Sequence, residues 1–277
     1  MRTENINIPL KLTSNGELVL HFIGTGSAFT KKNFQNNLII IKGNNHLVVD
    51  FGTKASQGLF EKGVKTEDIQ GYLITHTHAD HIGSLEEAAL LGRYFTKRKP
   101  DLIIPKILEK ILWNNGLKAG IAFNEDPPLT LKDLFNIIYP RKVTKDRYGR
   151  LTYHIKYKGI DLLIFKTNHI PSNGSLSSSI WTSGIIIDER ILFTADTKFD
   201  PELLETFDKF FNIELIIHDC QFFTGGVHAG YDELKTLPER LKKKMLLSHY
   251  ADNWQNFHPE NDGFIGFTKP DLLYIFD

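Results

Sequence analysis

The segment from Thr75 to Gly83 contains the densest group of chemically active residues in this chain, and it reads Thr-His-Thr-His-Ala-Asp-His-Ile-Gly. Within six positions it places three histidines and an aspartate, namely His76, His78, Asp80 and His81. Imidazole nitrogens and carboxylate oxygens are the ligands that zinc and related divalent ions take. A solvated polar loop is the alternative interpretation. The density of ligand residues favours a metal site.

The elements on either side of this segment explain how its ligands could converge. Residues 71–75 read as a buried strand, and Ser84 is a plausible N-cap of a helix-forming run with two glutamates in its first turn. In an extended chain, residues two apart project to the same side, so His76, His78 and Asp80 can converge. His81 would then turn in at the start of the helix.

Further ligands are needed, because four residues cannot complete two metal sites. Three candidates each follow a predicted strand, where sheet proteins place their functional loops: His169, Asp196 and His249. Taken singly, a histidine at a strand end is more often a hydrogen-bonded structural residue than a ligand. Together with the first cluster, the three become candidate ligands.

Strands and helices alternate along the chain. Short β-branched runs come first, at 18–23, 38–41 and 47–50, followed by a helix at 54–62 that Gly63 should end. The later elements are expected as strands at 153–157, 160–166, 179–187, 191–194, 214–218, 245–248 and 272–276, with helices at 201–211 and 231–241. No linker divides these series, so we expect one domain over 1–277, with a helical insertion at about 97–138.

Composition narrows the class of protein. The chain has 277 residues, of which 41% are hydrophobic and 24% charged, which excludes disorder for most of it. Lys and Arg number 33, as do Asp and Glu, so no global positive field favours nucleic acid. A single cysteine, no opening signal segment and no long apolar run predict a cytoplasmic protein that does not enter the membrane, in the host cytoplasm if the chain is viral.

Five motifs in order resemble the metallo-β-lactamase superfamily across nearly the whole chain: Asp50, the cluster at 76–81, His169, Asp196 and His249. The opening Phe22-Ile-Gly-Thr-Gly-Ser-Ala28 and the stretch His218-Asp-Cys-Gln-Phe222 resemble its phosphodiesterase branch. That branch contains ribonuclease Z and cyclic-nucleotide phosphodiesterases, among them the phage anti-Pycsar enzymes.

The resemblance implies an α/β fold, an αββα sandwich of two mixed sheets flanked by helices, and two divalent metal ions. Zinc is expected, with manganese or another ion as the alternative. One ion would be held by His76, His78, His169 and Asp196, and the other by Asp80, His81, Asp196 and His249. Asp196 would bridge them, and Asp50 would orient ligands through hydrogen bonds. A simple turn residue is the alternative reading of Asp50.

The resemblance also implies the catalytic residues. Two divalent ions about 3.5–4 Å apart lower the pKa of a shared water and stabilise the oxygens around phosphorus. Asp80 is expected to take part in this centre. His228 is the candidate general acid, with Asp219 as the group that holds it. Alternatively, His228 caps the helix that starts nearby.

The substrate is inferred by elimination. Ribonuclease Z proteins carry a long arm that grips transfer RNA, inserted between the residues that match His169 and Asp196. Here these residues are only 27 positions apart, which leaves no room for the arm. We therefore predict a phosphodiesterase that opens 3′,5′-cyclic nucleotides, as in phage evasion of cyclic-nucleotide immune signalling. The resemblance also implies a homodimer, because relatives in this branch are commonly homodimers. The alternatives are a transfer-RNA 3′-end endonuclease, a lactone or thioester hydrolase, and a binding module without turnover.

The basic stretch 141–150 favours the RNA alternative. Its arginines and lysines, with Tyr148 and Tyr153 between and beside them, could bind a single strand by stacking on bases. A solvated hairpin is the other interpretation. Asn173, Ser175 and Ser177 to Ser179 follow His169 and could donate hydrogen bonds to a phosphate, or could simply begin a strand.

Overall fold

The computed structural model describes residues 1–143, 147–170, 176 and 179–277. They form two compact units. The first unit comprises Met1–Gly24, Phe34–Pro140 and Lys269–Asp277, and the second comprises Thr25–Asn33 and Arg141–Thr268. Among the described residues, no helix has the length and apolar character needed to cross a membrane.

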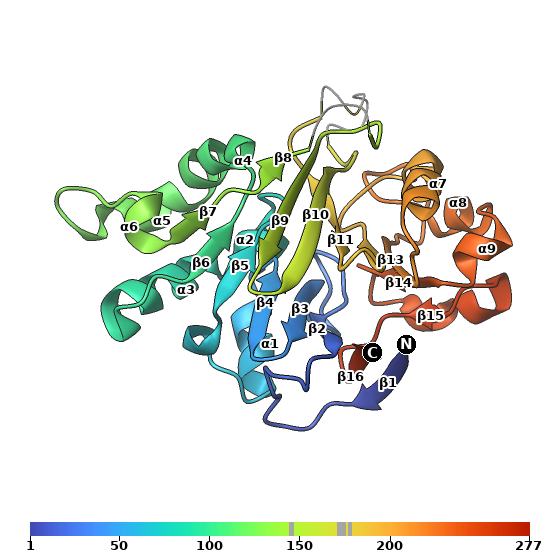
Figure 1. Cartoon of the computed structure of the whole chain (residues 1–277), viewed down its shortest axis with the longest axis horizontal. Coiled ribbons are helices and arrows are strands. Elements are labelled where there is room, and N and C mark those ends of the chain that lie inside the picture. The colour runs from blue at the N-terminus through green and yellow to red at the C-terminus, as the bar shows by residue number, and fades with distance from the viewer. Residues whose placement is uncertain (144–146, 171–175, 177–178) are drawn as a thin grey trace. The chain divides into compact units, whose positions relative to one another are not determined.

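The first unit is built on a mixed sheet, whose strands β2 to β5 appear in blue to cyan in Figure 1. Within the described residues the sheet has eight strands, in the order β1 (Arg2–Asn5), β16 (Leu272–Phe276), β2 (Leu18–Gly24), β3 (Asn37–Lys42), β4 (Asn45–Val49), β5 (Gly71–Leu73), β6 (Asp101–Ile103) and β7 (Asn136–Ile138). Strands β4 to β7 run parallel, and the others pair antiparallel. The predicted β-branched strands are therefore confirmed, and nearly all of their residues are buried.

Short helices follow the strands of the first unit. Helix α1 (Ala55–Glu61) packs on β2, where Gly58 faces Ile23, and the chain leaves it at Gly63 with φ +72°, as predicted. Helices α2 (Ala79–Ile82) and α3 (Leu85–Leu90) follow β5. Ser84 occupies the N-cap position of α3, as predicted, but its hydroxyl does not cap the helix and donates to the Gly52 carbonyl instead, at 2.7 Å.

The predicted helical insertion at 97–138 is only partly helical. It contains the α-helices α4 (Lys106–Ile111), α5 (Lys118–Ile121) and α6 (Leu131–Leu134), the π-helix η3 (Leu112–Leu117) between α4 and α5, and the 3₁₀ helix η4 (Ala122–Asn124). Its two ends, however, are the strands β6 and β7, which extend the sheet beside β5. These strands have three residues each, too short to show a strand period in the sequence.

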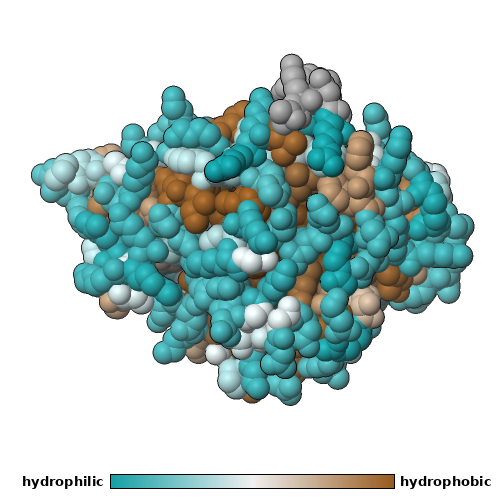
Figure 2. Space-filling model, in the orientation of Figure 1, coloured by the Kyte–Doolittle hydropathy of each residue, from teal (hydrophilic) through white to brown (hydrophobic). Residues whose placement is uncertain are grey.

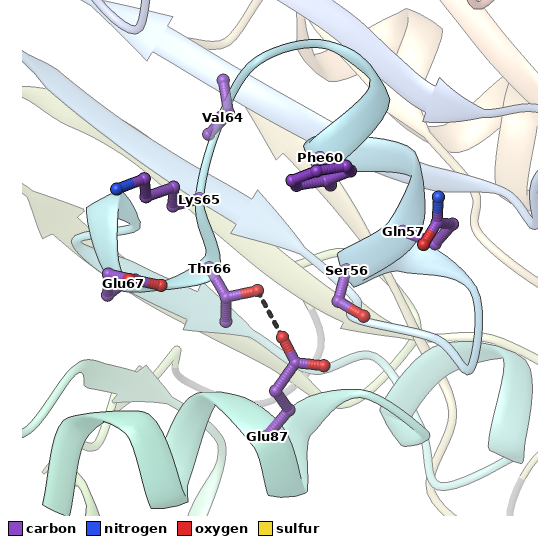
Figure 3. A pocket seen from close by; sticks show the side chains of 8 residues that line it. All are labelled: Ser56, Gln57, Phe60, Val64, Lys65, Thr66, Glu67 and Glu87. Atoms are coloured by element: carbon purple, nitrogen blue, oxygen red, sulfur yellow. Dashed lines mark hydrogen bonds between the residues drawn. The ribbon is translucent and has the colours of Figure 1, made fainter. Parts of the chain in front are cut away.

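A pocket of about 460 Å³ lies between α1, the 3₁₀ turn η1 (Thr66–Asp68) and α3. Figure 3 shows Phe60 on one side of it and the Thr66 hydroxyl directed toward Glu87 on the other, where it donates a hydrogen bond of 2.9 Å. This hydrogen bond links η1 to α3.

The second unit has its own mixed sheet, in which the hairpin β9–β10 is prominent in Figure 1. Its eight strands within the described residues follow the order β15 (Gly266–Phe267), β14 (Met245–Ser248), β13 (Leu215–Asp219), β12 (Ile191–Phe193), β11 (Ser183–Ile187), β10 (Ile160–Lys166), β9 (Thr152–Tyr157) and β8 (Arg141–Lys142). Strands β12 to β15 run parallel, and β8 to β12 pair antiparallel. The predicted fold class, α/β with two mixed sheets and helices, is confirmed.

Helix α7 (Pro201–Phe210) begins where predicted, because Asp200 accepts a hydrogen bond from the Leu203 amide at 3.0 Å. It buries Leu203, Leu204 and Phe207 in one core with residues of β10, β13 and β14. The single helix predicted for 231–241 is wrong. Two short helices occur there, α8 (Tyr231–Lys235) and α9 (Glu239–Lys242), since Pro238 lacks the N–H that a continuous helix needs.

The basic stretch 141–150 contributes more to the core than predicted. Tyr148 is 5% exposed and packs against Phe207 and Phe211, so it has no face on which a base could stack. The buried Arg150 guanidinium pairs with Asp200 at 3.2 Å. The predicted base-stacking role of Tyr148 is therefore wrong. Residues 144–146 of this stretch, together with Asn173, Ser175, Ser177 and Ser178, lie outside the described residues.

Candidate metal centre

The first unit gathers four predicted ligands between the end of β5 and helix α2. Nε2 of His76 lies 2.9 Å from Nδ1 of His78, and Nε2 of His81 lies 3.2 Å from an Asp80 carboxylate oxygen. The rings of His76 and His81 are 4.0 Å apart, centroid to centroid. His76, Asp80 and His81 are buried, and His78 is half-buried. His76 and His78 come together as predicted for the extended chain. The prediction that Asp80 continues this alternation is wrong, because Asp80 already belongs to α2 and its carboxylate contacts His81 instead.

Asp50 follows β4 and is hydrogen-bonded to Thr75 and to His81 of this cluster. It accepts hydrogen bonds from the backbone N–H of Thr75 at 2.8 Å and from its hydroxyl at 2.7 Å. Nδ1 of His81 donates to the same carboxylate at 2.7 Å, which leaves Nε2 of His81 available as the ligand atom. Burial raises the pKa of Asp50, while the adjacent His81 acts to lower it. These contacts support an orienting role for Asp50 rather than that of a simple turn residue.

The loop backbone of the first cluster is held by residues that the sequence did not single out. The Asn37 side chain donates to the Asp80 carbonyl at 3.1 Å and accepts from the Gly52 N–H at 2.8 Å. A Cβ atom on Gly52 would lie 1.8 Å from that carbonyl oxygen. Only glycine therefore fits at position 52. Asn37 and Gly52 lie far from the ligands in sequence, and neither belongs to a ligand residue type.

The second unit gathers the ligands predicted at strand ends. Asp196 follows β12, and one of its carboxylate oxygens lies 3.6 Å from Nε2 of His249 and 3.8 Å from Nε2 of His169. His249 follows β14 in a left-handed conformation, with φ 60°. Asp196, His169 and His249 are each at most 2% exposed. Three loops of one sheet thus bring their side chains to the same place.

Asp219, at the end of β13, contacts two histidines of the second unit. Its carboxylate lies 2.7 Å from Nδ1 of His228 and 3.3 Å from Nδ1 of His249. Burial acts to raise the pKa of Asp219, but the two imidazoles outweigh burial and lower it. Burial acts to lower the pKa of His228, but the Asp219 charge and hydrogen bond raise it. The contact of Asp219 with His249 was not predicted from the sequence.

The His228 side chain does not cap helix α8, which was the alternative interpretation of this residue. Gly230 occupies the N-cap of α8, and Nδ1 of His228 donates to Asp219 instead. In the same loop the Val227 carbonyl accepts from Nδ1 of His169 at 2.8 Å. Burial lowers the pKa of His169, which keeps its imidazole neutral as a metal ligand must be. His218 is buried within β13 and donates to the Asp219 carbonyl.

The donor atoms of both clusters fit a divalent metal ion. In the second unit, one ligand atom from each of Asp196, Asp219, His228 and His249 lies within 4.8 Å of the others. These four residues are the predicted general acid His228, its partner Asp219 and two predicted metal ligands, Asp196 and His249. The first unit offers three imidazoles and a carboxylate, and both sets consist of the N and O donors that zinc and manganese accept.

The chain matches the family model described as "Anti-Pycsar protein Apyc1" over residues 18–274. A relative of that name from Bacillus phage BSP38 is 36% identical over 260 residues, covering 92% of this chain and 97% of the relative. Another, from Paenibacillus sp. (strain J14), is 34% identical over 259 residues, covering 93% and 98%. Relatives therefore occur in both phage and bacteria.

Solved structures share the fold at low sequence identity. A diphosphatase from the PhnP family matches with a TM-score of 0.66 and 14% identity, over 94% of this chain and 97% of that one. Human tRNase Z, short form, matches with a TM-score of 0.63 and 14% identity, over 92% and 98%. The metallo-β-lactamase fold protein YhfI from Bacillus subtilis matches with a TM-score of 0.63 and 18% identity, over 94% of this chain and 99% of that one, which confirms the metallo-β-lactamase fold. With a family model that spans nearly the whole chain and relatives above 30% identity, this chain belongs to the Anti-Pycsar protein Apyc1 family.

Proposed function

We propose that this chain is a metal-dependent phosphodiesterase that hydrolyses 3′,5′-cyclic nucleotides to linear nucleoside monophosphates. The observation that carries the proposal is the match to the anti-Pycsar family over residues 18–274. The anti-Pycsar enzymes that the sequence resembles are cyclic-nucleotide phosphodiesterases. The histidine and aspartate clusters of both units supply the residues that this chemistry requires.

The two clusters together would hold two divalent ions, which we propose to be zinc. His76, His78, His169 and Asp196 would bind one ion, and Asp80, His81, Asp196 and His249 the other. When bound, such ions supply a hydroxide near neutral pH and stabilise charge on the phosphoryl oxygens. Asp50 fixes the His81 ring so that Nε2 remains the ligand atom, and the Val227 carbonyl does the same for His169.

His228 is the proposed general acid of the reaction. In the hydrolysis, an oxygen–phosphorus bond forms with water, one ribose P–O bond breaks, and the leaving ribose oxygen takes a proton. With Nδ1 of His228 donating to Asp219, Nε2 is the atom that would release this proton. The Asp219 carboxylate raises the pKa of His228 against the effect of burial, and so increases the fraction of His228 that carries the proton.

The alternatives have less support. Tyr148, one of the two tyrosines that favoured RNA processing, is buried, and the likeness to human tRNase Z is one of fold alone. No comparison favours a lactone or thioester hydrolase or a module without turnover. We also propose that the protein forms a homodimer and acts in the cytoplasm. A measurement of its mass in solution tests the homodimer.

A turnover assay tests the proposed function. The metal-loaded protein is offered 3′,5′-cyclic nucleotides, cyclic dinucleotides and a precursor transfer RNA, with Asp80→Ala as the control. We expect opening of a cyclic mononucleotide that the substitution abolishes, with the RNA left intact. Cleavage of the RNA alone would overturn the proposed substrate class, while cyclic dinucleotide hydrolysis would correct its ring size.

A further inference from the structure

A second cavity of the first unit differs in character from the pocket of Figure 3. It has a volume of about 670 Å³ and lies among α4, the π-helix η3 and the start of α6, all within the insertion. This volume falls within the range of about 300–1,000 Å³ that is common for small-molecule sites. The cavity contains no residue of the predicted metal centre.

Three apolar side chains line part of this cavity, and we refer to them as its floor. Ile107 from α4 is 50% exposed, Trp113 from η3 is half-buried, and Leu131 from α6 is buried. Figure 2 shows hydrophobic surface gathered over the region of α4 and β7. An indole and two aliphatic side chains form a surface on which a planar or apolar ring can lie.

The rim of the cavity is positively charged. It carries three lysines and one glutamate: Lys106, Lys110, Lys132 and Glu109. Lys106 pairs with Glu109 and donates to the Tyr139 hydroxyl. Within the part of the chain that the structure describes, neither Lys110 nor Lys132 forms an ion pair. Three lysines against one glutamate leave the lining with an excess of positive charge.

The other polar groups at the rim do not offset this charge. The Thr130 hydroxyl donates to Asp133 at 2.6 Å, where it caps α6, and Asn114 is uncharged. By contrast, the pocket of Figure 3 carries Glu67 and Glu87 against one lysine, Lys65, and so offers no excess of positive charge. The combination of an apolar floor and a net positive rim therefore distinguishes this cavity.

We propose that this cavity binds a small anion that carries an aromatic or apolar ring. The ring would lie on Trp113, Ile107 and Leu131, and the phosphate or carboxylate would pair with Lys110 and Lys132. The site is separate in residues from the metal centre, so the proposal does not depend on the proposed activity. A nucleoside monophosphate and an aryl carboxylate share this chemistry.

The indole N–H resonance of Trp113 provides a local readout of binding in the full-length, metal-loaded protein. It is assigned by its loss in Trp113→Phe and followed during titration with 5′-AMP, 2-naphthoate and inorganic phosphate. We expect a saturable shift with at least one of the two ring-bearing anions and none with phosphate alone. A shift with AMP only identifies a phosphate ligand, and one with 2-naphthoate only identifies a carboxylate ligand.

Charge reversals locate the anion. Lys110→Glu and Lys132→Glu should each weaken binding about tenfold, since a nearby attractive charge becomes repulsive. Lys118→Glu, an exposed lysine of the same insertion outside the cavity, is the matched control and should bind as the wild type does. All three variants should keep wild-type turnover. Absence of a saturable shift, insensitivity to both reversals, or a shift that follows protein concentration because a second copy covers the cavity would overturn the proposal.

Discussion

Nδ1 of His228 donates a hydrogen bond to the Asp219 carboxylate across 2.7 Å, at the end of β13. This bond directs the other ring nitrogen of His228 away from Asp219. Asp219 also accepts from the backbone N–H of Thr197 at 2.9 Å, which fixes the carboxylate in turn. The pair therefore has the geometry of a held and tuned proton donor.

Replacing His228 by Ala should slow turnover of a cyclic nucleotide by about 100-fold or more, the usual contribution of a positioned acid. Metal content should stay at the wild-type value, because His228 is not among the proposed ligands. Steady-state kinetics and elemental analysis of the same sample check both points. Loss of metal from this variant would instead make His228 a ligand, as its place beside Asp196 and His249 allows.

Asp219→Asn keeps the size of the side chain but removes its charge. The pKa of His228 is raised by that charge, so it should fall in this variant. The alkaline limb of the rate profile should then move to lower pH, since His228 loses its proton earlier. A profile that keeps its alkaline limb in Asp219→Asn would contradict the assignment of His228 as the acid.

Asp196→Ala should empty both metal positions, because Asp196 is the proposed bridge. Elemental analysis after dialysis is the measurement, and we expect less than one ion per chain. Asp161→Ala, an acidic residue of β10 away from the cluster, is the matched control and should keep two. Two ions retained by Asp196→Ala would refute the bridging role.

Gly52→Ala should destabilise the first unit. The added Cβ would meet the Asp80 carbonyl oxygen at 1.8 Å, so the loop carrying the ligands must shift. We expect a loss of about 2 kcal/mol in the free energy of unfolding, in the range for overpacking, together with weaker metal binding. Gln57→Ala, on the nearby helix α1, should change neither quantity. Wild-type stability of Gly52→Ala in chemical denaturation would show that the loop is not held as described.

His21 should make stability depend on pH. Burial lowers its pKa from 6.5 to about 4, although Nδ1 donates to the Leu272 carbonyl at 3.1 Å. As pH falls, His21 takes up a proton in the unfolded chain before it does so in the folded one. The protein should therefore lose stability between about pH 6.5 and 4, and above that window His21 should have no effect on stability.

The difference in pKa corresponds to about 3 kcal/mol. Denaturant unfolding at pH 7 and at pH 4 measures how much unfolding free energy each protein loses on acidification. The wild type should lose about that amount more than His21→Asn, whose side chain cannot titrate. Equal losses in the two proteins would mean that His21 is protonated in the folded state as readily as in the unfolded one.

The sequence was sufficient to single out the histidines and aspartates that cluster in each unit and to predict most strands, because candidate ligands are recognisable by residue type and buried strands by their apolar runs. The four residues at 76–81 and the strand-end positions 169, 196 and 249 each lie in the cluster that their unit forms. Helix ends were predicted where one residue dominates locally, as at Gly63 and Pro201.

The sequence was insufficient where tertiary contacts decide. Asn37, Gly52 and the Val227 carbonyl support the clusters from distant positions, and backbone atoms carry no mark in a sequence. Tyr148 looked like a surface aromatic among basic residues, but contact with α7 buries it. Strands β6 and β7 form because a neighbouring strand pairs with them, and not from their own pattern.

The most direct test of the proposed activity is phosphorus NMR of a 3′,5′-cyclic nucleotide incubated with the metal-loaded protein. We predict that the cyclic phosphodiester signal converts to that of a linear monophosphate, and that neither Asp80→Ala nor chelated protein produces this change. A cyclic signal that persists with the metal-loaded wild type, across purine and pyrimidine nucleotides, would contradict the account.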